Sequence, residues 1–308
     1  MPATGCPVWI GTSQTMNAFF AQAPSDLEAV VSELQTRMAS QPNLQWALLI
    51  DTAFDHGTPQ LLGESAINCY AGDETLNELQ DLAPCLIAID PASEAGWNRF
   101  RALIKHCNGR PMWSLVGRAG RISAIPEHWR SYLLVDVGDQ EHMLLRFADT
   151  RLLGNLPALL GEQWSAFAGP LTVWLHPDRQ GRMIELPMVP EGQLPTQIRL
   201  SPEQIMSFVR TAESDGHLNA LWQVQPEILD RETPSHVFHD WAEAACRLAD
   251  EQRIESHADR QTLVLLAVQY RGSIHENRSL TRLLELRDWV PGKLAGAILH
   301  SLDLLDLS

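Results

Sequence analysis

The chain has 308 residues, of which 45% are hydrophobic, and it carries a formal net charge of −15 at pH 7. This length gives room for about two domains of ~100–200 residues each, and the hydrophobic content excludes a mostly disordered chain. The acidic balance disfavours nonspecific binding to nucleic acid, because contacts to phosphate groups need a basic surface.

The first residues, MPATGCPVWIGTSQTMN, contain neither a basic stretch nor a continuous apolar stretch, so we expect no secretory signal. No apolar run approaches the ~18–20 residues that a membrane helix needs, and we expect no membrane partner. The five cysteines lie far apart, without a C-x-x-C pair or zinc-ligand spacing. These features predict a cytoplasmic protein with no disulfide framework and no bound metal.

Helix-like and strand-like patterns alternate through the first 188 residues. The expected helices span residues 24–40, 73–82, 93–106 and 126–136, and the expected strands span residues 44–50, 85–89 and 111–116. Such alternation is typical of an α/β domain. The turn-forming residues 177–181 lead into a further strand at 182–186, and this hairpin argues against a purely parallel sheet. We therefore expect a mixed sheet with helices.

Residues 142–181 predict a strand, a charged turn, a leucine-rich helix and another strand. The three charges of the turn, Arg146, Asp149 and Arg151, stand where the first strand gives way to the helix. Charges at such a corner are costly to bury unless they pair. We therefore predict that Arg146 or Arg151 forms a structural clamp with Asp149. Direct contact between these charges and a partner protein is the alternative.

Trp174 is one of ten tryptophans in the chain and falls on the polar phase of the predicted strand at 171–176. A strand that alternates apolar and polar residues is typically buried on one face only. An exposed tryptophan is a good anchor for a protein partner. Trp174 is therefore a candidate surface residue, and packing under the helical domain is the alternative.

The strand patterns stop after a proline-rich stretch at 187–200, PMVPEGQLPTQIRL. A serine followed by proline, Ser201-Pro202, then marks the start of a helix. Further helices are expected at residues 234–251, 259–270, 277–287 and 291–305. The sequence therefore predicts an α/β domain over residues 1–188 and a smaller, all-helical domain over residues 189–308.

Charge is segregated along the α/β domain. Residues 51–94 hold nine acidic residues and no lysine or arginine, whereas residues 99–130 hold seven basic residues and one acidic one. These are either solvated faces or a bipolar surface that orients a protein partner and speeds the encounter.

The catalytic motifs that we sought are missing from the sequence. No nucleophile-elbow, P-loop or dinucleotide-binding motif occurs, so we expect no cofactor and no enzymatic activity. Asp51 and Asp55 follow a predicted buried strand, a place where α/β enzymes often carry catalytic carboxylates. A role in turn formation is favoured, because aspartate is common in turns. A divergent α/β hydrolase-like enzyme that uses Asp51 or Asp55 remains the alternative function.

Several stretches resemble one known family. Residues 145–153, LRFADTRLL, are similar to the "fRfyDPRvL" signature of the type VI secretion effector chaperones, with Ala148 and Thr150 departing from it. Residues 46–53, 82–87 and 167–174 are similar to strands of that family, and the resemblance covers about residues 44–182. It implies a cytosolic chaperone or adaptor whose partners are a cognate effector protein and the spike, a valine-glycine-repeat protein onto which the effector is loaded.

Overall fold

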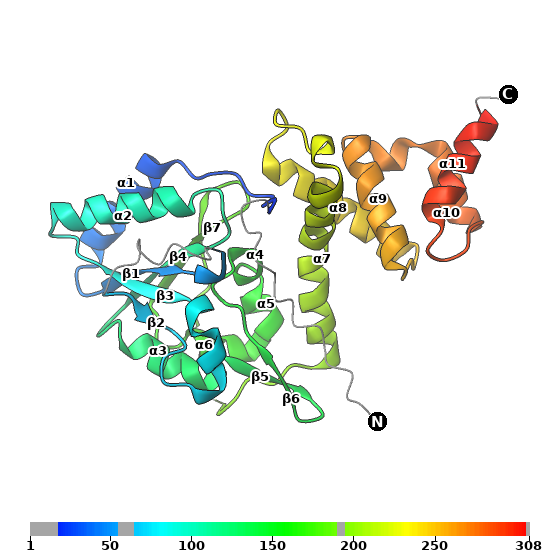
Figure 1. Cartoon of the computed structure of the whole chain (residues 1–308). Helices are drawn as coiled ribbons and strands as arrows, with labels where there is room; N and C mark the ends of the chain where they lie inside the picture. Colours follow the sequence, from blue (N-terminus) through cyan, green and yellow to red (C-terminus); the bar gives the residue numbers. More distant parts are fainter. Residues whose placement is uncertain (1–17, 55–64, 190–194, 306–308) are drawn as a thin grey trace.

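The computed structural model describes residues 18–54, 65–189 and 195–305, and it consists of an α/β region followed by a helical region (Figure 1). A six-stranded sheet with the order β2-β3-β1-β4-β7-β8 forms the centre of the α/β region. Its strands are β1 (Gln45–Ile50), β2 (Ile67–Asn68), β3 (Cys85–Ile89), β4 (Trp113–Arg118), β7 (Val173–Pro177) and β8 (Met183–Glu185). The predicted α/β class is confirmed. The sheet, which we expected to be mixed, is instead antiparallel in every described pair.

Both faces of the sheet are buried. On one face, α1 (Leu27–Ser40) and α2 (Glu94–Cys107) pack on side chains such as Leu48 and Leu115. The other face is covered by shorter helices, and its core includes Leu49 and Trp174. These helices are α3 (Ala124–Trp129), α4 (Thr150–Leu153), α5 (Leu156–Leu160) and α6 (Trp164–Ala168). The two helical layers lie on opposite sides of the sheet in Figure 1.

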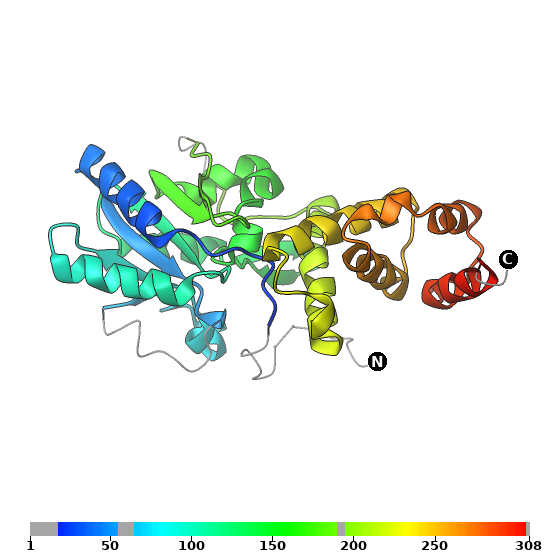
Figure 2. The same cartoon turned by 90° about the horizontal axis from the view of Figure 1, so that it is seen from above.

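The region after residue 200 is helical, as predicted. It contains α7 (Pro202–Val224), α8 (Ser235–Glu251), α9 (His257–Gln269), α10 (Arg278–Leu286) and α11 (Leu294–Leu305), which extend away from the sheet (Figure 2). The Ser201 hydroxyl and the Gln204 side chain form a reciprocal capping box, which explains why α7 begins there. In the described part of the chain, no helix combines the length and apolar character needed to cross a bilayer.

Helix α7 joins the two hydrophobic cores. Phe208, near its start, belongs to the core of the α/β region, whereas Leu218 and Leu221 belong to the core of the helical region. The segment before α1 also reaches the helical core, because the ring of Phe19 lies 5.7 Å from Trp222 and 5.8 Å from Phe238 between centroids. The two regions are therefore connected by more than one segment of the chain.

Residues 195–200 run along the α/β region before α7 begins. Ile198 and Leu200 are buried in its core, and the Leu200 amide donates to the Asp136 carbonyl at 2.8 Å. This stretch belongs to the proline-rich segment in which we placed the domain boundary. The boundary between residues 188 and 189 stays a prediction.

Two local predictions were wrong in detail. The helix expected at 126–136 ends early, and β5 (Leu134–Gly138) instead forms a hairpin with β6 (Glu141–Leu144). Residues 74–82 are helical as expected, in the form of a 3-10 helix, η4 (Glu74–Leu82). The leucine-rich helix is split into α4 and α5, which are separated at Gly154 and Asn155.

Candidate functional site

Of the three charges singled out in the sequence, Asp149 and Arg151 lie at the start of α4, and Arg146 lies in the segment between β6 and α4. We call Asp51, Arg146, Asp149 and Arg151 the arginine–aspartate cluster. Asp149 is the N-cap of α4, and its Oδ1 accepts from the Arg151 backbone amide at 3.1 Å. The same side chain is 2% exposed, so its charge is almost fully removed from water. A buried carboxylate needs a cationic partner or several hydrogen bonds to remain charged.

Arg151 supplies that partner. Its Nε donates to Asp149 Oδ1 at 3.0 Å, and its Nη2 donates to Oδ2 at 2.7 Å. This two-pronged geometry is the strongest form of the carboxylate–guanidinium pair. Burial alone would lower the pKa of Arg151, but the Asp149 carboxylate raises it above its usual value. Arg151 and Asp149 are therefore paired, and the role of this pair as a structural clamp stays a prediction.

Arg146 pairs with Asp51 and not with Asp149. Arg146 Nη2 donates to Asp51 Oδ2 at 2.9 Å, and Asp51 Oδ1 accepts from the Ala53 amide at 3.0 Å. Asp51 is 2% exposed, whereas the Arg146 side chain is 42% exposed. Burial raises the pKa of Asp51, and the Arg146 charge opposes that rise. The pair joins the end of β1 to the segment that follows β6.

Phe54 lies against both arginines of the cluster. The Cζ atoms of Arg146 and Arg151 lie 5.4 and 5.2 Å from the centroid of its ring. A guanidinium at this distance from an aromatic face is attracted to the ring electrons. Phe54 was not identified from the sequence, where only its position shortly after β1 sets it apart.

The cluster is balanced in charge and its groups satisfy one another. Two carboxylates face two guanidinium groups, and both oxygens of each carboxylate accept hydrogen bonds. This arrangement can lock β1, the segment after β6 and α4 together. Asp55, the second candidate for a catalytic carboxylate, lies outside the described residues.

The expected exposure of Trp174 is wrong. Trp174 is 0% exposed, and its indole N–H donates to the Ser114 hydroxyl at 3.0 Å. Its ring stacks on Trp129 at 5.5 Å and on Trp164 at 5.8 Å between centroids. The strand alternates in the predicted manner, but helices cover its second face as well as its first. Trp174 is therefore part of the core and cannot act as an exposed anchor.

Phe147 links the charged turn to this aromatic core. Its ring lies 4.6 Å from Trp129 and 5.4 Å from Phe167 between centroids, and the side chain is 0% exposed. The neighbouring Arg146 side chain reaches Asp51. The two adjacent side chains therefore connect the hydrophobic core to the arginine–aspartate cluster.

His176 is a buried residue near this cluster that the sequence did not point to. It lies under α4, where a Cβ on Gly154 would come within 3.1 Å of its Cε1 atom. Its Nδ1 is 3.0 Å from the Pro177 carbonyl, and Nε2 has no hydrogen-bond partner among the described residues. Burial lowers the pKa of His176, which favours the neutral ring.

One group of side chains in the helical region has the composition of a metal site. Ligand atoms of Glu213, His217 and Cys246 all lie within 4.8 Å of one another. Arg260, however, donates to both oxygens of the Glu213 carboxylate, with Nη2 at 2.7 Å from Oε2. A cation would have to displace that guanidinium, so the donor set fits an internal ion pair better than a metal.

Comparison with known proteins finds one family model that matches part of the chain. Residues 46–166 match the model of a domain family of unknown function, DUF4123, which is known in type VI secretion effector adaptors. The matched range runs from β1 to α6 and contains the whole arginine–aspartate cluster. No curated protein and no solved structure matches the chain.

Proposed function

We propose that this protein is an adaptor that binds a cognate type VI secretion effector and helps to load it onto the valine-glycine-repeat spike protein. The observation that carries the proposal is the match of residues 46–166 to a family known in such adaptors. The resemblance of residues 145–153 to the signature of the effector chaperones supports it independently of the fold.

The geometry of the signature supports a scaffolding role for these residues. Asp149 and Arg151 neutralise each other, and Arg146 neutralises Asp51, so the cluster stabilises the α/β region from within. Partner proteins would then bind the surface that this scaffold presents.

The proposal includes the absence of enzymatic activity. A carboxylate that acts as a general base needs an oxygen within hydrogen-bond reach of the substrate proton. Both oxygens of Asp51 accept hydrogen bonds, and the side chain is buried. This geometry favours the adaptor over a hydrolase based on Asp51.

The proposed location is the cytoplasm, with neither nucleic acid nor a membrane among the partners. A net charge of −15 would repel phosphate groups and anionic lipid surfaces alike. The segregation of acidic and basic residues between 51–94 and 99–130 would instead orient a protein partner.

Co-expression tests the proposal. The full chain is produced together with the protein encoded by the adjacent gene, and soluble yield and co-purification are measured with and without it. We expect the chain to raise the soluble yield of that protein and to co-purify with both it and the spike. The rate of association should fall as salt is added. The adaptor function is refuted if the chain changes none of three properties of the adjacent-gene protein: its solubility, its abundance and its association with the spike.

A further inference from the structure

Helix α7 has a weak point where it passes from one hydrophobic core to the other. Its first turns pack on the α/β region beside α4 and α5, and its later turns pack on α8 (Figure 1). Gly216 lies between Phe208, which belongs to the first core, and Leu218, which belongs to the second. A Cβ at Gly216 would meet nothing within 4 Å among the described residues, so packing does not require a glycine there. Because glycine weakens the interior of a helix, α7 resists bending least at this position.

Asp215, next to this glycine, ties α7 to the α/β region. Arg179, in the turn between β7 and β8, donates to both of its carboxylate oxygens, from Nη1 to Oδ1 at 3.0 Å and from Nη2 to Oδ2 at 2.6 Å. Burial alone would raise the pKa of Asp215, but the charges of Arg179 and Arg151 lower it below its usual value. The α/β region therefore holds α7 directly beside its weak point. We call the pair of Arg179 and Asp215 the latch.

The segment before α1 connects the same two regions a second time. Phe19 packs on the core of the helical region, as described above. The ring of its neighbour Phe20 lies 5.5 Å from that of Phe54, whose ring also lies against both arginines of the arginine–aspartate cluster. Two adjacent residues thus contact different regions. The backbone of this segment also reaches the latch, because the Ala23 amide donates to the Arg179 carbonyl at 2.7 Å.

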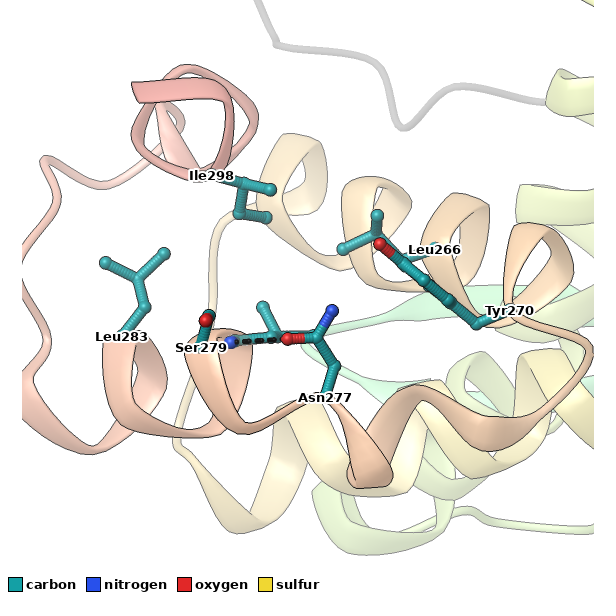
Figure 3. Close-up of a pocket in the computed structure, with 7 residues that line it drawn as sticks. Leu266, Tyr270, Asn277, Ser279, Leu283 and Ile298 are labelled. Atoms are coloured by element: carbon teal, nitrogen blue, oxygen red, sulfur yellow. Dashed lines mark hydrogen bonds between the residues drawn. The ribbon is translucent and has the colours of Figure 1, made fainter. Parts of the chain in front are cut away.

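The last helices pack closely against one another. The hollow between α9, α10 and α11 has a volume of about 20 Å³, which is room for roughly one water molecule (Figure 3). Asp259 on α9 is 1% exposed and accepts from the Trp289 indole at 3.1 Å and from the Leu294 amide at 2.9 Å. These bonds fix the start of α11 against α9. A bend in α7 would therefore leave the contacts among these helices intact, and they would move together.

We propose that α7 is a hinge at Gly216, and that the latch and the segment before α1 hold this hinge in one position. When the latch opens, the helical region would turn as one body relative to the α/β region. Closure and opening about a few residues is a common form of conformational change in proteins. The inference does not depend on the adaptor function. A partner that contacts both regions would select one angle between them.

Matched substitutions in the turn between β7 and β8 test the latch. Arg179→Gln removes the latch, whereas Arg182→Gln removes an exposed ion pair with Asp178 that stays within the turn. Fluorophores attached to azide-bearing phenylalanine analogues at Gln35 and Glu251, exposed positions on α1 and α8, report the distance between the two regions by single-molecule energy transfer. In Arg179→Gln alone, we expect a second distance whose population is about tenfold or more above that in the wild type. Identical distance distributions in Arg179→Gln and Arg182→Gln would overturn the proposal.

A further substitution tests the position of the hinge. Gly216→Ala stiffens the middle of α7, so its addition to Arg179→Gln should reduce the population of the second distance by about fivefold. Gly296→Ala on α11 is the matched control, because a Cβ there would also meet nothing within 4 Å in the described structure. This control should leave the population unchanged. If the two alanine substitutions have the same effect, the hinge does not lie at Gly216.

Amide hydrogen exchange separates an open latch from a loss of folding. We expect Arg179→Gln to exchange faster than the wild type around Gly216, while β1 and α9 keep their protection. Loss of protection in β1 or α9 would show that the latch supports a core rather than the angle between the two regions, and it would refute the proposal.

Discussion

The guanidinium of Arg146 donates to the carboxylate of Asp51 at 2.9 Å, although 95 residues separate the two in the chain. The two partners differ in their access to water, since Asp51 is buried and the Arg146 side chain is 42% exposed. Replacement of Arg146 and replacement of Asp51 should therefore lower the free energy of unfolding by different amounts. An arginine freed from its partner can be hydrated, whereas a carboxylate left alone in the core cannot.

Replacement of Arg146 should be more harmful than replacement of Asp51. We expect Arg146→Met to reduce the free energy of unfolding by about 2–3 kcal/mol at pH 7, less than the ~3–5 kcal/mol of a fully buried pair. Asp51→Asn should reduce it by about 1 kcal/mol. Chemical denaturation measures both values. Equal losses would show that burial does not control the energy of this pair.

The loss in Arg146→Met should depend on pH. Burial already raises the pKa of Asp51 in the folded chain, and removal of the arginine charge raises it further. A carboxyl whose pKa is raised in the folded state binds its proton more tightly there than in the unfolded chain. The stability of the variant should therefore increase relative to the wild type as pH falls from neutrality towards the unfolded-state pKa. Thermal melts of the variant and the wild type from pH 7 to pH 4 measure this trend. A difference in stability that does not change with pH would contradict the prediction.

Asp149 should contribute more to folding than to recognition. Asp149→Ala removes the N-cap of α4 and leaves the mostly buried Arg151 without a partner, so we expect a loss of about 3–5 kcal/mol. Asp149→Asn is the control, because asparagine also caps helices but lacks the charge, and its loss should be smaller. An unchanged melt for Asp149→Ala, together with loss of effector binding, would show that the cluster acts on the partner.

Gly272 should tolerate no side chain. It lies in the turn that follows α9, in the left-handed region with φ +84°, and an added Cβ would lie 2.6 Å from Trp241 Cδ1. We expect Gly272→Ala to destabilise the protein by about 1–3 kcal/mol. Gly216→Ala is the matched control, because Gly216 is exposed within α7 and an added Cβ would meet nothing within 4 Å. That substitution should stabilise by about 0.5–1 kcal/mol. Thermal melts that reverse this order would contradict the prediction.

The helical region should lose stability in acid through Glu213. Burial alone would raise the pKa of Glu213, but hydrogen bonds from His217 and Arg260 outweigh it and lower the pKa to about 2. A carboxyl with a lowered pKa adds stability above its unfolded value, near 4.5, and that stability is lost as pH falls towards 2. Glu213→Gln should therefore be less stable than the wild type at pH 7, with a difference that shrinks between pH 4.5 and 2. Denaturation at several pH values measures this difference in stability. A difference that stays constant between pH 4.5 and 2 would contradict the prediction.

The sequence was most informative where local patterns determine the structure. The apolar run at 44–50 and the cap at Ser201 lead to β1 and α7 as predicted. At residues 134–136 a helical pattern was overridden, because β5 pairs with β6 and Asp136 also bonds with Leu200. The bond between Asp136 and Leu200 joins residues far apart in the chain, and such a bond leaves no local trace in a single sequence.

The candidate site shows the same limit. Asp149 and Arg151 are two residues apart, so their pairing could be predicted from the turn itself. The partnership of Arg146 with Asp51 depends on how β1 and the segment after β6 meet in space. The burial of Trp174 depends on a second layer of helices, which the alternation of one strand cannot reveal. Contacts within a turn were thus accessible from the sequence, whereas layers and long-range pairs were not.

The packing of Phe19 against Trp222 and Phe238 has a consequence for synthesis of the protein on the ribosome. Phe19 is made first, and its aromatic partners follow about 200 residues later, which corresponds to about 10–40 s at typical elongation rates of ~5–20 residues per second. During that interval the α/β region can assemble, but this early segment has no helical core on which to dock. Docking of Phe19 therefore belongs to the last steps of folding, after α8 has been translated.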